Sequence, residues 1–582
     1  MEPVTLQQTV DSLLTNTVDT SLPLFKPELA ICATIVVLLL VRVFKGGEYI
    51  PSFLLALVGS ITALCLALPT DGFASWQGLE RQELFTGMLV YDTLTAFIRV
   101  FLMAFAVLFI VLSRLTGIAS TKDGQDYYTL VLGATLGMCL MASSNHLLML
   151  FMSVEMASVP SYVLAGIVKG RQRSSEAALK YAVYGAGTAG VMLYGTSLLA
   201  GILGTVHIPT MATELAALDI PNLLTTGEGR LMVMVLVLGG LMLGVGLAFK
   251  LSAVPFHFWC PDVFEGASAE VDAFLSVASK AAAMVLLLRV GIGLGLAPDS
   301  IQSVDAPQRT PAIAVALADD ATPAQPAAVP FQAVASQIVT AEETTPVGSG
   351  PLSPVRRFFV IMVSLVAIVT CTFGNLAAYG QTNIKRMFAY STIAHAGFMM
   401  MAIAAAVALA GRDVVEARSA VSALLLYVAV YLFMNLTAFA VVAFLRNSMH
   451  SEQIADYAGL VRSSPLIAVL MTAVLVSLIG LPPLAGFWPK LRVLQALYMA
   501  GGPLMITVLV AAALNTAISL VYYLRVAKVM CIDPEPDSRG PVSLGFLPSA
   551  YVFVVAVPVI IFGLLPNALA NWTDLAVSQL FS

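Results

Sequence analysis

Residues 231–266 decide the fold: the apolar run LMVMVLVLGGLMLGVGLAFK (231–250) continues directly into LSAVPFHFWCPDVFEG (251–266). The first part is long enough to cross the roughly 30 Å hydrocarbon core of a bilayer as a helix. Lys250 ends this run, and Pro255 follows it with no backbone N–H to donate. We therefore predict an interrupted membrane helix with an ammonium group beside the break. A charge inside a membrane costs about 2.5–3.5 kcal/mol and usually marks an ion or proton path.

Four more ionisable residues repeat this arrangement within apolar segments. They are Glu155 in LLMLFMSVEMASVPSYVL, Lys180 in EAALKYAVYG, Lys280 in FLSVASKAAAMVLLL and Lys490 in LAGFWPKLRVL. Because such residues usually face the interior of a helix bundle, the pattern indicates a membrane protein that handles protons.

The composition excludes a soluble protein. The 582 residues are 59% hydrophobic and 11% charged, with a mean hydropathy of +0.90, whereas about a quarter of the residues of a soluble domain are charged. A net charge of −5 gives no reason to expect a nucleic-acid partner. The six cysteines are scattered singly, without the close pairs of a metal or iron–sulfur site, so we expect no redox centre in this chain.

Fourteen hydrophobic segments have the length of a membrane-spanning helix. They lie near 28–45, 51–69, 85–113, 127–144, 146–168, 175–201, 230–250, 269–297, 357–378, 388–410, 419–445, 465–497, 502–529 and 547–570. We predict an all-α polytopic membrane protein with about 14 transmembrane helices. The first residues lack the basic start and apolar core of a cleavable signal, so we expect the first helix to be retained.

Basic loop residues set the expected orientation, because loops rich in Lys and Arg stay in the cytoplasm. On one side of this topology lie Arg42, Lys45, Arg114, Lys122, Lys169, Arg171, Arg173, Lys385, Arg386, Arg525 and Lys528. The opposite loops carry acidic residues such as Asp71, Glu83 and Glu214. We expect both termini to be external, on the periplasmic side of a cell inner membrane.

The chain divides into six parts around a central segment of different composition. They are an N-terminal tail (1–27), three N-terminal transmembrane helices (28–113), a first five-helix half (127–297), a linker (298–356), a second five-helix half (357–530) and a C-terminal transmembrane helix with a tail (531–582). The linker is rich in Ala, Pro and Thr and cannot build a core, so we expect an external loop; alternatively it binds a partner.

The two halves each place a lysine beside a proline-broken helix, as inverted-repeat transporters do. The same 95-residue spacing separates Glu155 from Lys250 and His395 from Lys490. We therefore expect Lys490 to be the counterpart of Lys250, and its helix to be interrupted at Pro482–Pro483.

Several long motifs carry a specific family resemblance. They are SVEMASVPSYVLAG, AALKYAVYGA, FKLSAVPFHFWCPDVFEGAS, FLSVASKAAA, GNLAAYGQTNIKRMFAYSTIAHAGF, YLFMNLTAFAVV, DYAGL and SLIGLPPLAGFWPKLRVL. In this order they resemble the N subunits of proton-pumping NADH–quinone oxidoreductases, which are antiporter-like subunits of respiratory complex I. The resemblance covers nearly the whole chain outside the N-terminal tail and the linker. It implies two inverted five-helix repeats with broken helices on the proton path.

The resemblance also implies roles for individual residues. Glu155 is similar to the glutamate that switches between lysine partners, and Lys180 and Lys250 match the lysines near it. Lys280 resembles the central lysine, His395 lies in the family's SSIAHAG-like segment, and Lys490 matches the lysine on the exit side. The family usually has EGAPTPVTAFLS where this chain has EGASAEVDAFLS, which adds Glu270 and Asp272, and Pro489 stands where a glycine is usual.

These residue types suit a relay, because an opposite charge within about 4–6 Å favours the ionised form of a buried group that burial itself disfavours. When a Glu155–lysine pair opens, a neighbouring lysine is driven to release its proton. We expect the proton to pass from Lys250 through Lys280 and His395 to Lys490.

Each residue also has a structural interpretation. Lys250 and Lys180 can extend to the interface, Lys280 and Glu155 can form structural pairs, and His395 can be a hydrogen-bonded core histidine. Lys385 and Arg386 are most simply positive-inside anchors, and His257 and Trp259 packing residues. Glu270 and Asp272 suit a helix N-terminus, and Arg289 is a cation of unknown role.

Together these features predict a proton-translocating subunit of an NADH–quinone oxidoreductase, an enzyme complex in whose other subunits we expect FMN, iron–sulfur clusters and quinone. The expected partners are those membrane-arm subunits and the lipid bilayer, with no cofactor in this chain. The alternatives are a subunit of a cation/proton antiporter or a membrane-bound hydrogenase, and a scaffold that moves no ions.

Overall fold

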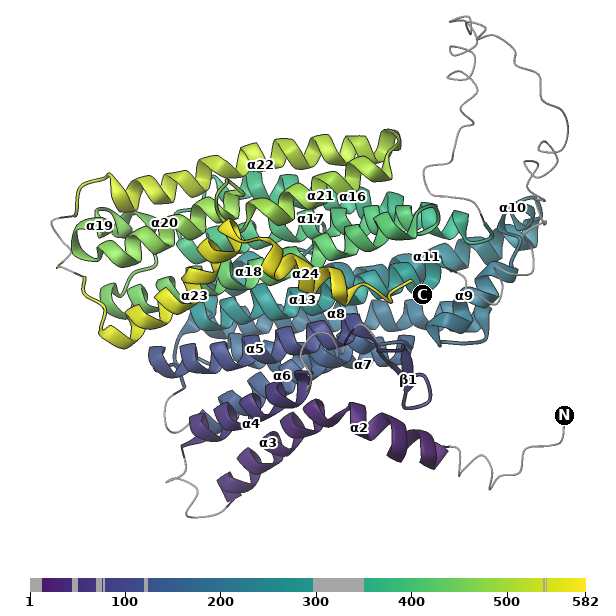
Figure 1. Ribbon diagram of the computed structural model, residues 1–582, viewed down its shortest axis with the longest axis horizontal. Helices are drawn as coiled ribbons and strands as arrows, with labels where there is room; N and C mark the ends of the chain where they lie inside the picture. Colours follow the sequence, from purple (N-terminus) through teal and green to yellow (C-terminus); the bar gives the residue numbers. More distant parts are fainter. Residues whose placement is uncertain are drawn as a thin grey trace, which may run out of the picture.

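The computed structural model describes residues 13–43, 51–69, 76, 79–119, 124–296, 350–536, 540 and 542–581. Most of them are helical, and the long helices lie side by side along the longest axis of the molecule (Figure 1). Most of the predicted linker, 298–356, lies outside the described residues, as do residues 1–12 of the predicted tail.

The N-terminal part begins with a bent pair of helices. Its elements are η1 (Asn16–Ser21), α2 (Leu22–Leu24), α3 (Lys26–Val43), α4 (Ser52–Ala67), β1 (Gln82–Leu84), β2 (Leu89–Tyr91) and α5 (Thr93–Thr116). The segment Leu13–Leu24 meets α3 at 80°, so the second half of the predicted tail is helical. The predicted helix 85–113 starts later than expected, because residues 82–91 form an antiparallel hairpin. The Asp92 side chain accepts a hydrogen bond from Thr95 N (2.8 Å) and thereby starts α5.

The first half contains the first interrupted helix. Its elements are α6 (Gly124–Ser143), α7 (Leu147–Ala165), α8 (Gln172–Leu203), α9 (Ile208–Ala217), α10 (Ile220–Leu223), α11 (Gly227–Leu251), α12 (Trp259–Gly266) and α13 (Ala269–Gly295). Ser252 has a left-handed backbone (φ 57°) that ends α11. The chain resumes its helical path at Trp259, after Pro255, so the interruption predicted from the sequence is present.

The second half contains the second interruption. Its elements are α16 (Ser353–Ala378), α17 (Ile384–Ala410), α18 (Val414–Met449), η4 (Ile454–Tyr457), α19 (Leu460–Ser463), α20 (Pro465–Ile479), α21 (Phe487–Ala500) and α22 (Gly502–Cys531). Gly480 ends α20 with φ +91°, and a Cβ there would lie only 2.6 Å from Lys490 Cδ. Glycine is thus required by both the backbone and the lysine. The chain ends with α23 (Phe546–Leu564) and α24 (Asn567–Ala576), which lies across the bundle near α18 (Figure 1).

Three helices form the centre of the bundle. Every residue in the most apolar 18-residue stretch of α13 and of α17 is buried. Nearly every residue in the corresponding stretch of α18 is buried as well. Lys280 lies on α13 and His395 on α17, so both are held between packed helices.

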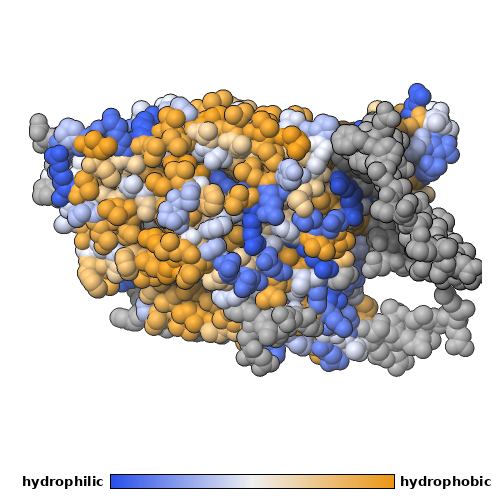
Figure 2. Space-filling view, turned by 45° about the horizontal axis from the view of Figure 1, so that its top comes forward, coloured by the Kyte–Doolittle hydropathy of each residue, from blue (hydrophilic) through white to orange (hydrophobic). Residues whose placement is uncertain are grey.

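The surface is apolar over wide areas, as a membrane protein requires. The outer helices α8, α11 and α22 expose large side chains such as Leu179, Met234 and Leu514, and Figure 2 shows broad hydrophobic regions on one face. Within the described residues, ten helices are long and apolar enough to cross a membrane, and the bent N-terminal pair makes up to eleven. Each of the fourteen predicted segments overlaps a helix or an interrupted pair, but the number of membrane crossings stays a prediction.

The two ends of the bundle differ in their loops. The hairpin at β1 and the helices α9 and α10 lie at one end, and α19 lies at the other (Figure 1). The first end carries Glu83, Glu214 and Asp219, which the sequence placed outside the cell. The orientation and the six-part division stay predictions.

The interruptions correct one prediction. Lys250 precedes its break, at the end of α11, whereas Lys490 follows its break, in the first turn of α21. Lys490 is therefore not the counterpart of Lys250, and the equal spacing in sequence is accidental. The residue in a comparable place after the first break is Asp262, on α12.

Candidate functional site

Lys250 is buried beside α7. Its Nζ donates to Ser158 Oγ at 3.0 Å, and Ser158 lies three residues after Glu155 on the same helix. Glu155 is half-buried, and its carboxylate and the Lys250 ammonium lie close enough for their charges to interact. The structure thus brings together the glutamate and the lysine that the sequence singled out, and Lys250 does not extend to the surface.

Lys180 lies in a different environment. Its Nζ is 2.8 Å from Glu176 Oε1 and 2.8 Å from Asp262 Oδ2, and its side chain is 36% exposed. Its ion pairs in the described residues thus involve these two carboxylates and not Glu155, the partner that the resemblance suggested.

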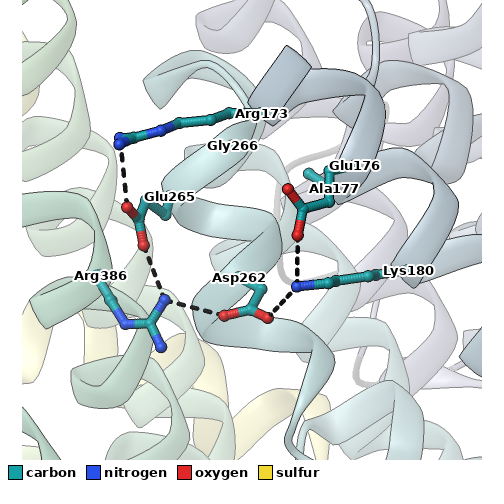
Figure 3. A pocket seen from close by; sticks show the side chains of 8 residues that line it. All are labelled: Arg173, Glu176, Ala177, Lys180, Asp262, Glu265, Gly266 and Arg386. Atoms are coloured by element: carbon teal, nitrogen blue, oxygen red, sulfur yellow. Dashed lines mark hydrogen bonds and ion pairs between the residues drawn. The ribbon is translucent and has the colours of Figure 1, made fainter.

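These groups line an open pocket of about 250 Å³ between α8, α12 and α17. Lys180 and Arg386 point at Asp262 from opposite sides (Figure 3), and Arg386 Nη1 lies 2.9 Å from Asp262 and 2.8 Å from Glu265. Arg386 therefore holds two carboxylates of α12 in place, and the interpretation as a positive-inside anchor does not account for these ion pairs. Asp262 and Glu265 were not predicted from the sequence, although the motif PDVFEG places both on one short helix directly after the break.

Lys280 lies at the centre of α13 and has a neutral partner. Its side chain is almost completely buried, and its Nζ donates to Thr392 Oγ1 on α17 at 3.3 Å. Thr392 lies one helical turn before His395 on α17, so Lys280 contacts this helix close to the histidine.

His395 is buried between two tyrosines. Its Nδ1 lies 2.8 Å from the Tyr427 hydroxyl and its Nε2 lies 3.1 Å from the Tyr523 hydroxyl. Both ring nitrogens therefore have a partner that can donate or accept a proton. The ring is also close enough to Lys280 and Lys490 for their charges to act on it. The structure thus places His395 between the two lysines, in agreement with the predicted order.

Lys490 occupies the second interruption. Its Nζ donates to Leu478 O at 3.0 Å and to Ile479 O at 2.8 Å, which are carbonyls left free at the end of α20. It also lies 4.7 Å from the centre of the Phe398 ring. The side chain is only 6% exposed, so Pro489 does not turn it toward lipid.

Three other buried cations, Arg289, Arg99 and Lys385, are paired with carboxylates. Arg289 Nη2 and Nη1 donate to the two oxygens of Asp92 at 2.7 and 3.0 Å, which gives the arginine of unknown role a structural partner. Arg99 Nε lies 2.7 Å from Glu28. Lys385 is completely buried with Nζ 3.0 Å from Glu452, so the anchor that we predicted at the surface is an internal ion pair.

The three central lysines differ from these cations. Lys250, Lys280 and Lys490 donate to a hydroxyl or to carbonyls, and within the described residues none has a carboxylate oxygen within 4.0 Å. No group of three or more His, Cys, Asp or Glu side chains suited to a metal ion occurs in the same described ranges. The site is a line of buried ionisable groups between two interrupted helices, and this defines the class: polytopic membrane proteins whose interior carries charge.

Comparison with known proteins identifies the family. Residues 144–302 and 348–516 match the model of the transmembrane proteins of NADH:quinone oxidoreductase and the Mrp antiporter. The chain belongs to this family.

Several relatives match it over nearly their full length. The chain is 34% identical to the NADH-quinone oxidoreductase subunit N of Anaeromyxobacter sp. (strain Fw109-5), over 96% of each chain. It is also 34% identical to subunit N 2 of Sorangium cellulosum (strain So ce56), over 96% of this chain and 98% of the relative. Among solved structures, a chain of respiratory complex I from Thermus thermophilus is 26% identical, with a TM-score of 0.66 and coverage of 94% of this chain and 98% of that one.

Proposed function

We propose that this chain is a membrane-arm subunit of an NADH–quinone oxidoreductase and translocates protons, coupled to electron transfer from NADH to quinone in partner subunits. The full-length similarity to relatives named subunit N and to a complex I chain supports this assignment. As part of that complex the chain is a component of a proton-translocating enzyme. Its partners are the other membrane-arm subunits, and FMN, iron–sulfur clusters and quinone belong to those partners.

One observation carries the proton-path part of the proposal: three buried lysines have neutral partners. A buried ammonium without a counter-ion loses most of its advantage over the neutral amine, so a lysine in such a place can give up its proton readily. Arginine does not deprotonate in this way. The buried arginines Arg99 and Arg289 are paired with carboxylates. Residues that cannot release a proton are thus neutralised by an ion pair, and the lysines that can release one are not.

The contacts described above support the following order of steps. When the Glu155 carboxylate is close to Lys250, it favours the protonated form of that lysine; when it moves away, the proton is released toward Lys280. The neutral Lys280 amine takes the proton, and Thr392 and His395 lead on from it. His395 accepts a proton on one ring nitrogen and releases the one on the other to Lys490. Lys490, held by the carbonyls at the second break, discharges it toward the external side.

Lys180 has a supporting role in this scheme. With Asp262 and Arg386 it forms the wall of the open pocket, which lies beside the basic residues at the start of α8. We place the termini outside the cell inner membrane and this pocket on the cytoplasmic side. There the pocket supplies water and charge near the first break.

A cation/proton antiporter is the second candidate, because the family model covers antiporter proteins as well. The relatives named subunit N favour the oxidoreductase. Purifying the chain with its partners separates the two: a complex that oxidises NADH supports the first function, and one without flavin and iron–sulfur subunits supports the second.

The central test is Lys280→Met in the assembled complex, with Lys528→Met, at an exposed helix end, as the control. Removing the amine should reduce proton pumping about 100-fold or more, the order of magnitude that a positioned proton-transfer group contributes. NADH oxidation with a quinone acceptor should fall with it, whereas the control should keep both. Normal pumping by a fully assembled Lys280→Met complex would rule out this path.

A further inference from the structure

Two acidic residues that depart from the family pattern lie in the core, at the start of α13. Glu270 and Asp272 are both 0% exposed. Among the described residues, none of their four carboxylate oxygens accepts a hydrogen bond. They do stand near a helix N-terminus, as the sequence suggested, but Ser268 is the residue that caps it. An ionised carboxylate without hydrogen bonds is very costly at such a place. The pair therefore requires an explanation other than helix capping.

Three more charged groups face this pair from neighbouring elements. Arg446 of α18 lies 3.5 Å from Glu270 Oε1. Lys385 of α17 lies 3.0 Å from Glu452 and donates to Ala267 O at 2.7 Å, directly before α13. The charges of Lys385, Glu452, Glu270 and Arg446 all act on Asp272. We call these five residues, Glu270, Asp272, Lys385, Arg446 and Glu452, the carboxylate cluster.

The charge of the carboxylate cluster does not balance when every group is ionised. It has three carboxylates and two cations, which leaves one negative charge in the interior. Two tyrosines border it, Tyr127 of α6 and Tyr457 of η4. Tyr127 shares its hydroxyl with Ser113, and the buried Tyr457 hydroxyl has no partner in the described residues. Neither adds a positive charge. One bound proton makes the cluster neutral, and Asp272, with no cation in contact, is the group that best holds it.

The position of the carboxylate cluster links it to the central lysine. Asp272, Ser276 and Lys280 follow one another at intervals of four residues and therefore lie along one face of α13. Ser276 is buried between the other two. Cys260, on α12, lies within range of the charges of both Lys280 and Asp272.

The other side of the carboxylate cluster reaches toward water. The side chains of Glu452 and Arg446 are 13% and 17% exposed, whereas Glu270 and Asp272 are fully enclosed. Burial thus increases from Glu452 to Asp272 and continues to Lys280. Lys385 lies in the first turn of α17, Arg446 in the last turn of α18 and Glu452 in the loop after α18.

We propose that the carboxylate cluster is a proton-loading site that takes a proton from the aqueous end through Glu452 and delivers it from Asp272 to Lys280. This inference rests on the proposed function, since it gives Lys280, which that path supplies from Lys250, a second proton donor on the aqueous side. In the transfer, the Ser276 hydroxyl gives its proton to the neutral Lys280 amine, where an N–H bond forms, and takes the proton of Asp272, whose O–H bond breaks. The Asp272 carboxylate is then protonated again from the Glu452 side, so no electron donor or acceptor takes part.

The first experiment asks whether the site holds a proton. Infrared spectra of the purified complex at neutral pH should contain the carbonyl band of a protonated, buried carboxylic acid. This band should be lost in Asp272→Asn and kept in Glu228→Gln, an exposed acid in the first turn of α11. If the wild-type complex has no such band, or if Asp272→Asn retains it, the loading site is wrong. That result would leave the proposed function unchanged, because it does not test proton pumping.

The second experiment asks whether the proton is used. Asp272→Asn should slow proton pumping about 10-fold or more at neutral pH, and Asp272→Glu should restore most of it, because it returns the carboxyl group. Native gels check that each variant is assembled. Normal pumping by Asp272→Asn, or a rate that follows Na⁺ concentration only while Asp272 is present, overturns the loading site. Normal pumping by Lys280→Met instead overturns the proposed function, so the two failures are distinguishable.

Discussion

The ion pair between Arg289 and Asp92 gives the sharpest test of stability. Arg289→Met leaves an almost completely buried Asp92 carboxylate that has lost two hydrogen bonds from the guanidinium. Removing one member of a buried pair costs about 3–5 kcal/mol, because the other charge remains buried. Asp92→Asn in the same chain removes that stranded charge and keeps a side chain that caps α5. We therefore expect the double variant to recover about 2–3 kcal/mol of the loss.

The measurement is the rate at which heat removes the chain from the native complex in isolated membranes, followed on native gels. A loss of 3 kcal/mol speeds this step by roughly 100-fold if the pair is broken in the transition state. Arg492→Met is the matched control, because its pair with Asp574 is 32% and 53% exposed. An exposed pair contributes at most about 1 kcal/mol, so the control should change the rate by less than roughly 5-fold. Equal rates for Arg289→Met and Arg492→Met, or no recovery in the double variant, would contradict the reasoning.

Two further predictions concern the proposed switch and the central linker. Glu155→Gln, which removes the charge but keeps the shape, should abolish most proton pumping, whereas Glu155→Asp should retain part of it; equal activities would show that the charge is not used. Replacing about 305–345 with a short Gly/Ser tether should leave assembly and turnover largely intact. A cysteine introduced at Asp320 should react with an impermeant reagent added outside intact spheroplasts, and labelling only after lysis would reverse the orientation.

The sequence predicted those parts of the site that depend on local signals. Pro255 and the pair Pro482–Pro483 mark both interruptions, because proline cannot continue a helical hydrogen-bond pattern. Lys280 was singled out because it lies far from either end of an apolar segment. The order of residues also shows that Lys250 precedes Pro255 and that Lys490 follows Pro482–Pro483. The equal spacing, which counts residues and ignores this order, therefore paired the wrong positions. The start of α5 was misplaced because an apolar hairpin resembles the first turns of a membrane helix.

Ion pairs between side chains on different helices could not be predicted from the sequence alone. Arg386 and Asp262 come from α17 and α12. Arg386 was interpreted from its neighbours in the sequence alone, and Asp262 was missed. Lys385 follows a loop, which made a surface anchor the simplest interpretation. Its burial depends on Glu452, which contacts it from the loop after α18. Such pairs join elements that are distant along the chain, so only the folded arrangement identifies them.

Cations in the interior therefore fall into two groups with different consequences. Those with a carboxylate partner, such as Arg289 and Lys385, keep a fixed charge, and their loss should first weaken the fold. The lysines with neutral partners, Lys250, Lys280 and Lys490, can change charge without breaking an ion pair, and their loss should first weaken proton transfer. The interior of the bundle thus contains ion-paired cations that keep a fixed charge and lysines whose protonation state can change. Measuring stability and pumping on the same variants tests this division, because each group should affect one quantity more than the other.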